Sequence, residues 1–224
     1  MGARRARLVL AAAGLAVRAH PRILSAAQAK VLARLGPLLS GRGFYLAGGT
    51  GLALRLGHRR SVDFDWFRGE PIVDPLRLAR ELQGAIPLVV VRTERGTLHA
   101  TLFGVRLSFI EYGYPLLGRL VEWKMNSVRV AALEDIACMK LAAVAQRGSR
   151  RDFVDVFALG RRIPLRRMLE LYRRKYGIRD SGHVLFALTY FDDAEKEPMP
   201  RMLRPWSWST IKRAVRSWAA EVAR

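Results

Sequence analysis

The sequence predicts an α+β fold, with a mixed β-sheet and flanking helices in the N-terminal half and a mainly helical C-terminal half. Between residues 44 and 112, short apolar runs are separated by glycine-containing breaks, as is typical of strands and turns. From about residue 131, apolar residues recur at helical spacing almost to the end. The chain has 224 residues, of which 50% are hydrophobic, enough for one good-sized core or for a core with a helical appendage.

The N-terminal half is expected to begin with a helix over residues 25–39, because its apolar residues recur at helical spacing and Ser25 can cap its first turn. The run 44–47 predicts a short buried strand. A brief helix is then expected to start after Gly49 and to end near Gly57.

A strand, a helix and three further strands should follow. Residues 61–67 alternate strictly between polar and apolar, which predicts a half-buried strand. The next segment has Asp74 as a helix N-cap and Pro75 at the first helical position. Three strand-like runs then cover 87–94, 97–103 and 105–112.

The C-terminal half should consist of helices, in which Ser149 and Asp152 have the spacing of a capping box. The expected helical segments are 131–148, 149–160, 165–177, 181–191 and 208–224. No internal repeat or low-complexity linker interrupts the chain. We therefore divide it into an N-terminal extension (1–20), an α/β core (21–122) and a mainly helical region (123–224).

The extension has a basic start and an apolar run of ten residues, the outline of a signal peptide. It lacks a clear cleavage site, and the run is too short to span a bilayer. A peripheral helix or an overextended start codon is the better interpretation, and no other segment approaches membrane-spanning length.

The charge of the chain points to a polyanionic partner. Lysine and arginine number 39 against 19 acidic residues, a net charge of +20. Such an excess favours nucleic acid or an anionic membrane, although codon bias toward arginine is an alternative explanation. Cys138 is the single cysteine, which excludes a disulfide framework and a cysteine zinc cluster and fits a cytoplasmic protein.

Two carboxylates in the strand at 61–67 indicate a metal site. Ser61, Asp63 and Asp65 share one face of this strand, because alternate residues point the same way. Two close and partly desolvated carboxylates repel each other by several kcal/mol, and Mg²⁺ would relieve the repulsion. The alternative is that both aspartates pair with Arg59 and Arg60. The other face of the strand, expected to enter the core, consists of Val62, Phe64 and Trp66.

A Gly48-Gly49-Thr50 turn precedes this strand and predicts a phosphate site. Two glycines let the backbone approach a ligand closely, and the N–H groups that open the next helix bind anions. Together with Ser61, the turn would cradle phosphates beside the metal pair, which is the apparatus of phosphoryl or nucleotidyl transfer. The spacing matches neither a Walker loop nor a dinucleotide-binding fingerprint.

Lys140 is the only charged residue between Asp135 and Arg147, in an otherwise apolar helix stripe. A lysine in such a stripe is costly unless an anion meets it, so it is a candidate triphosphate contact; the alternative is that its ammonium reaches solvent past small alanines. Asp152 and Asp155 lie near one face of the next helix, where Asp152 can also simply cap the helix.

These motifs resemble the DNA polymerase β-like nucleotidyltransferase superfamily. The string YLAGGTGLALRLGHRRSVDFDWF (45–67) is similar to the AbiEii/AbiGii toxins, the toxin half of type IV toxin–antitoxin pairs. Residues 133–159 and 188–200 also match, and the resemblance extends from about residue 25 to the C-terminus. It implies a nucleotidyltransferase-type sheet and an antitoxin partner.

The resemblance also assigns roles to residues. Asp63 and Asp65 would be metal ligands, and Lys140 and Asp152 would join them in the catalytic site, with Asp155 as a structural partner. The wider superfamily often supplies a third carboxylate, but here Ser108 stands where it is expected, and Glu111 lies on the opposite face by alternation. A single Mg²⁺ that arrives with the NTP is therefore the safer assumption.

Arginines that follow Lys140 are candidate RNA contacts. Arg147, Arg150 and Arg151 open a longer basic run, which is either an RNA-binding surface or a solvated helix face. The rest of the run is Arg161, Arg162, Arg166, Arg167, Arg173, Arg174 and Lys175. His58 could touch phosphate, whereas Trp206, Trp208 and Trp218 are expected to pack the terminal helix rather than stack on bases.

The expected activity is Mg²⁺-dependent transfer of NMP from an NTP to RNA, and the resemblance implies the tRNA 3′ end as acceptor and a cognate antitoxin, with no membrane partner. One alternative is a nucleotidyltransferase that modifies a protein or a small molecule. The other is a catalytically silent RNA-binding or partner-binding module of the same fold.

Overall fold

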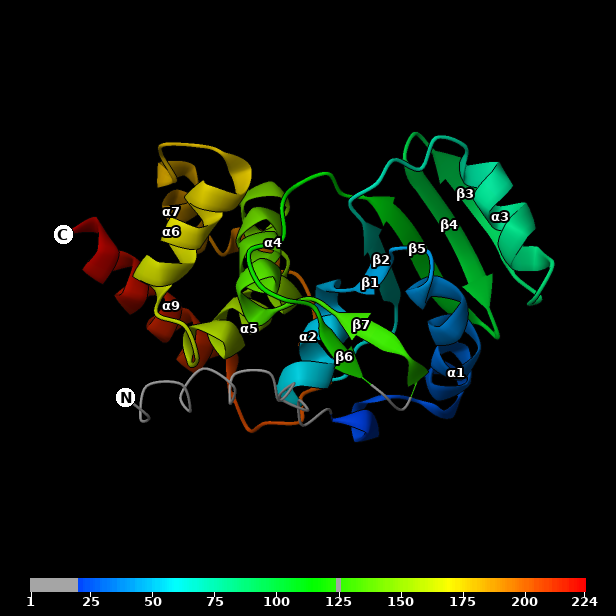
Figure 1. Ribbon diagram of the computed structural model, residues 1–224. Helices are drawn as coiled ribbons and strands as arrows, with labels where there is room; N and C mark the ends of the chain where they lie inside the picture. The colour runs from blue at the N-terminus through cyan, green and yellow to red at the C-terminus, as the bar shows by residue number, and fades with distance from the viewer. Residues whose placement is uncertain (1–19, 124–125) are drawn as a thin grey trace, which may run out of the picture.

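The computed structural model describes residues 20–123 and 126–224, so the N-terminal extension predicted over 1–20 lies almost wholly outside the described residues. Figure 1 shows a sheet with α1 and α3 beside it and a group of helices, α4 to α7 and α9, on the other side. This is the mixed α/β architecture predicted, helical in its C-terminal half.

In the described residues, seven strands form one sheet in the order β3-β4-β5-β2-β1-β7-β6. The pairs β2–β5 and β1–β7 are parallel and the others are antiparallel, so the sheet is mixed. The strands are β1 (Tyr45–Leu46), β2 (Phe64–Arg68), β3 (Val89–Glu94), β4 (Thr97–Leu102), β5 (Val105–Glu111), β6 (Val121–Trp123) and β7 (Val128–Val130).

The helices largely follow the sequence pattern. Ser25 and Gln28 form a capping box at the start of α1, and Asp74 caps α3 by accepting from the Arg77 N–H, so both predicted caps are confirmed. A short 3-10 turn, η1 (Pro21–Ile23), precedes α1. The α-helices are α1 (Ala26–Ser40), α2 (Gly48–Leu56), α3 (Pro75–Gln83), α4 (Leu133–Gln146), α5 (Arg150–Gly160), α6 (Leu165–Tyr176), α7 (Gly182–Thr189), α8 (Asp192–Glu195) and α9 (Trp208–Ala223).

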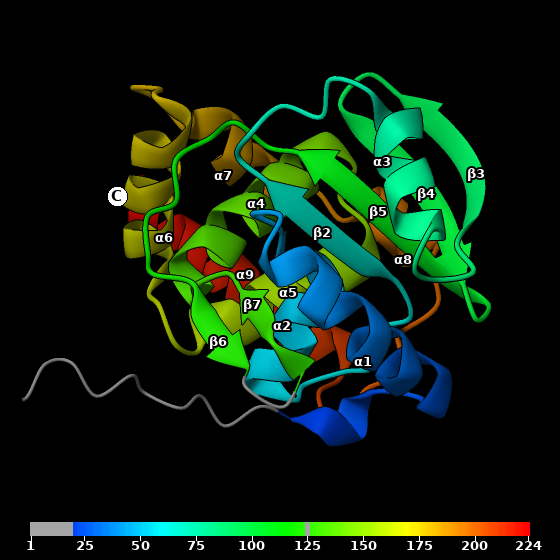
Figure 2. The same cartoon turned by 45° about the vertical axis from the view of Figure 1, so that its right-hand side comes forward.

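The sheet separates two hydrophobic cores. One contains Phe64 and Trp66 of β2 with residues of α1 and α3, and Figure 2 shows α3 lying over β3 and β4. The other contains Phe67 of β2 together with buried residues of helices α4 to α9. Asp65 therefore shares its side of β2 with Phe67, toward the helical half, because alternate strand residues share a face.

Two local expectations were wrong. Val62 is 63% exposed, because β2 begins at Phe64 and Val62 precedes the paired region. Ser149 and Asp152 make no capping box, because the Ser149 hydroxyl donates to the Asp152 carboxylate (2.6 Å) instead of accepting from the backbone. Phe64 and Trp66 are buried as predicted. No helix in residues 20–123 and 126–224 has the length and apolar character needed to cross a bilayer.

Candidate active site

A cleft of about 1450 Å³ lies between the sheet and helix α4, and it contains most of the predicted site. The predicted residues that line it are Gly48, Gly49, Ser61, Asp63, Asp65, Lys140, Arg147 and Arg151. Thr50, Arg150 and Asp152 do not appear among the described lining residues. The structure thus brings together residues separated by about a hundred positions in the sequence.

Asp65 lies against the glycine turn, and Asp63 lines the same cleft. Asp63 directly precedes β2 and Asp65 is its second residue, while α2 begins at Gly48 beside them. Gly48 has a φ of 60°, and a Cβ added there would collide with the Asp65 carboxylate. Glycine is therefore required both by the backbone conformation and by the close approach of Asp65.

Asp65 is an electrostatically disfavoured anion. Partial burial raises its pKa, and neighbouring Asp63 raises it further, while Lys140 and Arg147 oppose the shift. A carboxylate in this state gains from any added cation, since a nearby positive charge favours the ionised form. The site is consequently better suited to hold a cation than to remain without one.

Asp63 is paired with an arginine that the sequence did not point to. The Arg106 guanidinium donates to both of its carboxylate oxygens, at 2.7 Å from Nε and 3.1 Å from the second nitrogen. The predicted alternative, pairing with Arg59 or Arg60, is wrong for Arg59, which bonds Asp155 instead. Because the Arg106 side chain is 71% exposed, its ion pair with Asp63 is weak and would be a poor competitor for a divalent metal ion.

Asp63 and Asp65 could hold a Mg²⁺ ion whose remaining ligands come from water and the substrate. Asp65 lies opposite Ser108 in the β2–β5 register, so a hydroxyl occupies the position of a third carboxylate. Within the described parts of the chain, no three His, Cys, Asp or Glu side chains gather as a metal cage. Mg²⁺ is commonly held by one or two carboxylates, with water and substrate phosphates as its other ligands. Asp63 and Asp65 suit that arrangement.

The start of α2 lies at the cleft and has groups that suit an anion. The first N–H groups of a helix have no intrahelical acceptor and carry a partial positive charge, and here they belong to Gly48, Gly49 and Thr50. The Thr50 side chain, however, is buried and its hydroxyl donates to the Asp63 carbonyl. The Thr50 side chain therefore links α2 to the segment that carries Asp63. This differs from the prediction that it would contact a phosphate.

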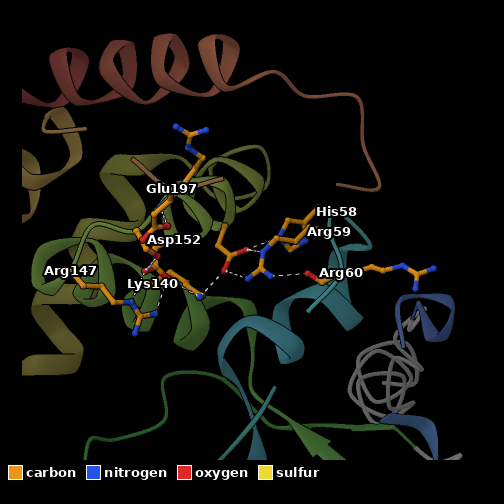
Figure 3. Close-up of polar contacts among 10 residues, drawn as sticks. His58, Arg59, Arg60, Lys140, Arg147, Asp152 and Glu197 are labelled. Atoms are coloured by element: carbon orange, nitrogen blue, oxygen red, sulfur yellow. Dashed lines mark hydrogen bonds and ion pairs between the residues drawn. The ribbon is translucent and has the colours of Figure 1, made fainter. Parts of the chain in front are cut away.

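A buried ion cluster lies behind this surface (Figure 3). Lys140 Nζ donates to Asp152 at 3.1 Å and lies 2.7 Å from Asp155. Asp155 also accepts from Arg59 Nε and from His58 Nε2, each at 2.7 Å. Lys140 is buried and meets two carboxylates, so the interpretation that its ammonium simply reaches solvent is wrong.

Three cations of this cluster are held in place at the wall of the cleft. Arg59, Lys140 and Arg147 line the cleft and are paired with Asp152 and Asp155. Lys140 and Arg147 also lie near enough to Asp65 to favour its charged form. Burial alone would raise the pKa of Asp155, but Arg59 and Lys140 hold it well below its ordinary value. The cleft wall therefore presents fixed, preorganised cations to an anionic ligand.

Asp152 orients cations rather than facing the cleft. It is buried and accepts from Lys140, from Arg147 Nε (2.8 Å) and from the Ser149 hydroxyl. Burial would raise its pKa, but Lys140 and Arg147 lower it, so it stays ionised. Asp152 is therefore suited to a positioning role, in which it holds Lys140 and Arg147 in place at the cleft.

The buried histidine of the cluster predicts a pH-dependent stability. Burial lowers the pKa of His58 despite its bond to Asp155. At mildly acidic pH the imidazole is therefore protonated more readily in the unfolded chain than in the folded one. The free energy of unfolding should therefore fall between about pH 7 and pH 5, by up to about 1.4 kcal/mol per pH unit. Urea unfolding across this range should show a smaller slope for His58→Gln; equal slopes in both proteins would contradict the assignment.

Several residues predicted to contact RNA or phosphate make contacts inside the protein instead. Arg150 bonds the carbonyls of Ala194 (2.7 Å) and Glu195 and lies over the Trp208 ring, so it fixes α8 and is a poor RNA ligand. Lys175 is buried and paired with Asp135. His58 is buried rather than aimed at a phosphate.

The tryptophans Trp206, Trp208 and Trp218 pack against Phe153 and Phe157, as expected. Cys138 is buried in the same core. Of the three arginines proposed as RNA contacts, Arg147 and Arg151 remain exposed at the cleft.

Sequence reasoning missed a group of aromatic residues that line the cleft. Four of the six tyrosines of the chain fall within 112–114 and 172–176, a clustering that could have been noticed. All four line the cleft. Residues 198–201 also line it, which gives a location to the third matching string of the sequence.

Comparison with known proteins agrees with this geometry. The family model described as "Nucleotidyl transferase AbiEii toxin, Type IV TA system" matches residues 103–217. An uncharacterised protein from Aquifex aeolicus (strain VF5) is 39% identical over 157 residues, which are 69% of this chain and 76% of the relative.

Similar solved structures share the fold. A putative nucleotidyltransferase from H. pylori has a TM-score of 0.53 at 15% identity, covering 87% of this chain and 91% of its own. The nucleotidyltransferase toxin MenT4 from Mycobacterium tuberculosis H37Rv has a TM-score of 0.51 at 19% identity, with coverages of 86% and 80%. ANT(2")-Ia in complex with adenylyl-2"-tobramycin has a TM-score of 0.52 at 14% identity, with coverages of 67% and 97%.

Proposed function

The chain belongs to the AbiEii family of type IV toxin–antitoxin nucleotidyltransferases, and on this premise we propose that it transfers NMP from an NTP to the 3′ end of tRNA. The observation that supports the proposal most is the single cleft lined by Asp63, Asp65, the Gly48-Gly49 turn and Lys140, in which Asp65 lies against Gly48. Carboxylates, a helix N-terminus and fixed cations are the groups that phosphoryl chemistry requires.

In the proposed reaction, each residue has a defined task. Asp63 and Asp65 would hold Mg²⁺, which when bound supplies charge neutralisation at the α-phosphate. The N–H groups of Gly48 and Gly49, together with Ser61, bind the phosphate tail, and Lys140 compensates its charge. The acceptor hydroxyl oxygen attacks the α-phosphorus and pyrophosphate leaves, while one of the two carboxylates takes the hydroxyl proton.

RNA as acceptor is supported by charge. The chain carries +20, and Arg147 and Arg151 stand at the edge of the cleft, where a phosphate backbone could follow the acceptor end. Family membership supports a cognate antitoxin as partner and NTP as substrate. We place the reaction in the cytoplasm, where tRNA is available.

A labelling experiment tests this proposal. Purified protein is incubated with Mg²⁺, total tRNA and each α-labelled NTP in turn, and the 3′ ends of the labelled RNA are mapped. We expect label on tRNA that is lost with EDTA and in Asp63→Asn. Label on protein would favour a protein acceptor, whereas nucleotide or RNA binding without any transfer would indicate a silent module.

A further inference from the structure

We propose that the tyrosine end of the cleft, formed by Tyr112, Tyr114 and Tyr176, is the subsite on which the nucleobase of the NTP stacks. This inference rests on the proposed function and adds a part of the site that no sequence motif indicates. The three residues come from different segments: Tyr112 follows β5, Tyr114 lies in the next loop, and Tyr176 ends α6.

The three rings form one continuous aromatic wall. The Tyr114 ring lies 5.1 Å from that of Tyr112 and 4.7 Å from that of Tyr176, edge to face in both cases. All three residues line the same cleft as the carboxylates, and Tyr114 is 47% exposed. Tyr114 is therefore the ring most available to a ligand.

The features of the cleft occur in the same order as the parts of a nucleotide. Gly49 lies beside Ser61, where the phosphate tail would lie, and the two carboxylates follow Ser61 along the chain at the start of β2. Farther along, the Tyr112 N–H donates to the Arg68 carbonyl (2.7 Å), at the end of β2. Asp65 and Arg68 are three positions apart in β2, which is about 10 Å at 3.3 Å per residue.

An NTP has its phosphate tail at one end, its base at the other and the reactive α-phosphorus between them. With the tail at α2 and the α-phosphate at the carboxylates, the sugar and base extend along β2 toward the tyrosines. The opposite placement would put a triphosphate against aromatic rings and a base against the helix N-terminus, where neither finds complementary groups.

A buried ion pair fixes the loop that carries Tyr114. Lys175 Nζ donates to the Pro115 carbonyl and to Asp135, each at 2.7 Å. Asp135 in turn accepts from the backbone N–H groups of Leu117 and Gly118. A loop held so firmly from beneath presents its tyrosine in one orientation, which is what a preorganised binding subsite requires.

The chemistry of the wall suits a base better than a charged group. The hydroxyls of Tyr112 and Tyr176 are 2.7 Å apart and bond each other. Burial raises the pKa of both tyrosines, so their hydroxyls remain neutral. Lys175, the cation nearest the Tyr112 ring, is already paired with Asp135. What remains for a ligand is aromatic surface, on which any base can stack.

The test compares a nucleotide with a ligand that has phosphates but no base. Calorimetry with Mg²⁺ measures the binding of each NTP and of inorganic tripolyphosphate to wild type, Tyr114→Ala and Tyr114→Phe. We expect Tyr114→Ala to weaken NTP binding about 5- to 150-fold, the range for loss of one stacking partner, and to leave tripolyphosphate binding unchanged. Tyr114→Phe should bind like wild type, because it keeps the ring.

Tyr190 offers a matched control, because it is also 47% exposed but is not among the described residues that line the cleft. Tyr190→Ala should bind both ligands like wild type. The inference is overturned if Tyr114→Ala binds NTP normally, if it loses NTP and tripolyphosphate alike, or if wild type binds no NTP. If wild type binds NTP through Tyr114 but labels no acceptor, the proposed function fails and the base subsite stands.

Discussion

Replacing Asp155 with alanine is expected to lower the free energy of unfolding by about 3–5 kcal/mol, the cost of removing one partner from a buried ion pair. Asp155 is fully buried and bonds Arg59, His58 and Lys140, so its loss leaves cationic groups in the interior with too little compensating charge. For a chain of this size the melting temperature should fall by about 6 to 20 °C. Urea and thermal unfolding measure both quantities.

The exposed Arg77–Glu81 pair on α3 provides the control. Both side chains reach solvent, so Glu81→Ala should cost less than about 1 kcal/mol. The Asp155 contribution should also depend on pH with a definite sign. Its pKa is held well below the ordinary value, so the contribution is complete above about pH 4 and is lost as the pH falls further. Equal costs for the two variants would mean that the cluster does not stabilise the fold.

Local sequence signals account for most of the fold. The caps at Ser25 and Asp74 depend on residues three positions apart, and the helical periods depend on neighbours within two turns. Strands β6 and β7 were not predicted, because strands of three residues are too short to show an alternating pattern of polar and apolar side chains. The position of β7 depends on its pairing with Leu46 of β1, a contact across more than eighty residues that no local pattern encodes.

The same limit applies to the site. The pattern of Asp63, Asp65, Gly48 and Gly49 is local, and these residues do line one cleft. Which cation meets which carboxylate is decided by tertiary packing. Arg59 lies close to Asp63 in sequence, yet it pairs with Asp155, 96 positions away.

The prediction for the basic run was wrong at two residues for the same reason. Arg150 and Lys175 look like solvent-facing cations in a helical pattern, but packing turns both inward. Lys175 finds its carboxylate in Asp135, 40 positions earlier, and Arg150 finds carbonyl groups in α8. Charge counts therefore predicted a polyanionic partner but could not say which arginines would meet it.

Asp65→Asn should have the opposite effect from Asp155→Ala on stability, although both remove a carboxylate beside Lys140. The pKa of Asp65 is raised by partial burial and by Asp63, which means that folding disfavours its charged form. At pH 7 the neutral asparagine should therefore leave the metal-free protein as stable as wild type or more stable. Below about pH 4 the difference should vanish, because the carboxylate is then protonated in both states.

The transferase activity of Asp65→Asn, unlike its stability, should fall. If Asp65 holds Mg²⁺ as proposed, its loss removes several kcal/mol of charge stabilisation, so transfer of labelled NMP should fall by about a thousandfold or more. Mg²⁺ with NTP should raise the melting temperature of wild type through binding to the folded state, and Asp65→Asn should lose most of that increase. A variant that is less stable than wild type at pH 7 would contradict this, since Asp65 would then be a structural partner of Lys140. A more stable but inactive variant means that the fold tolerates an unfavourable charge at Asp65 because the reaction needs it.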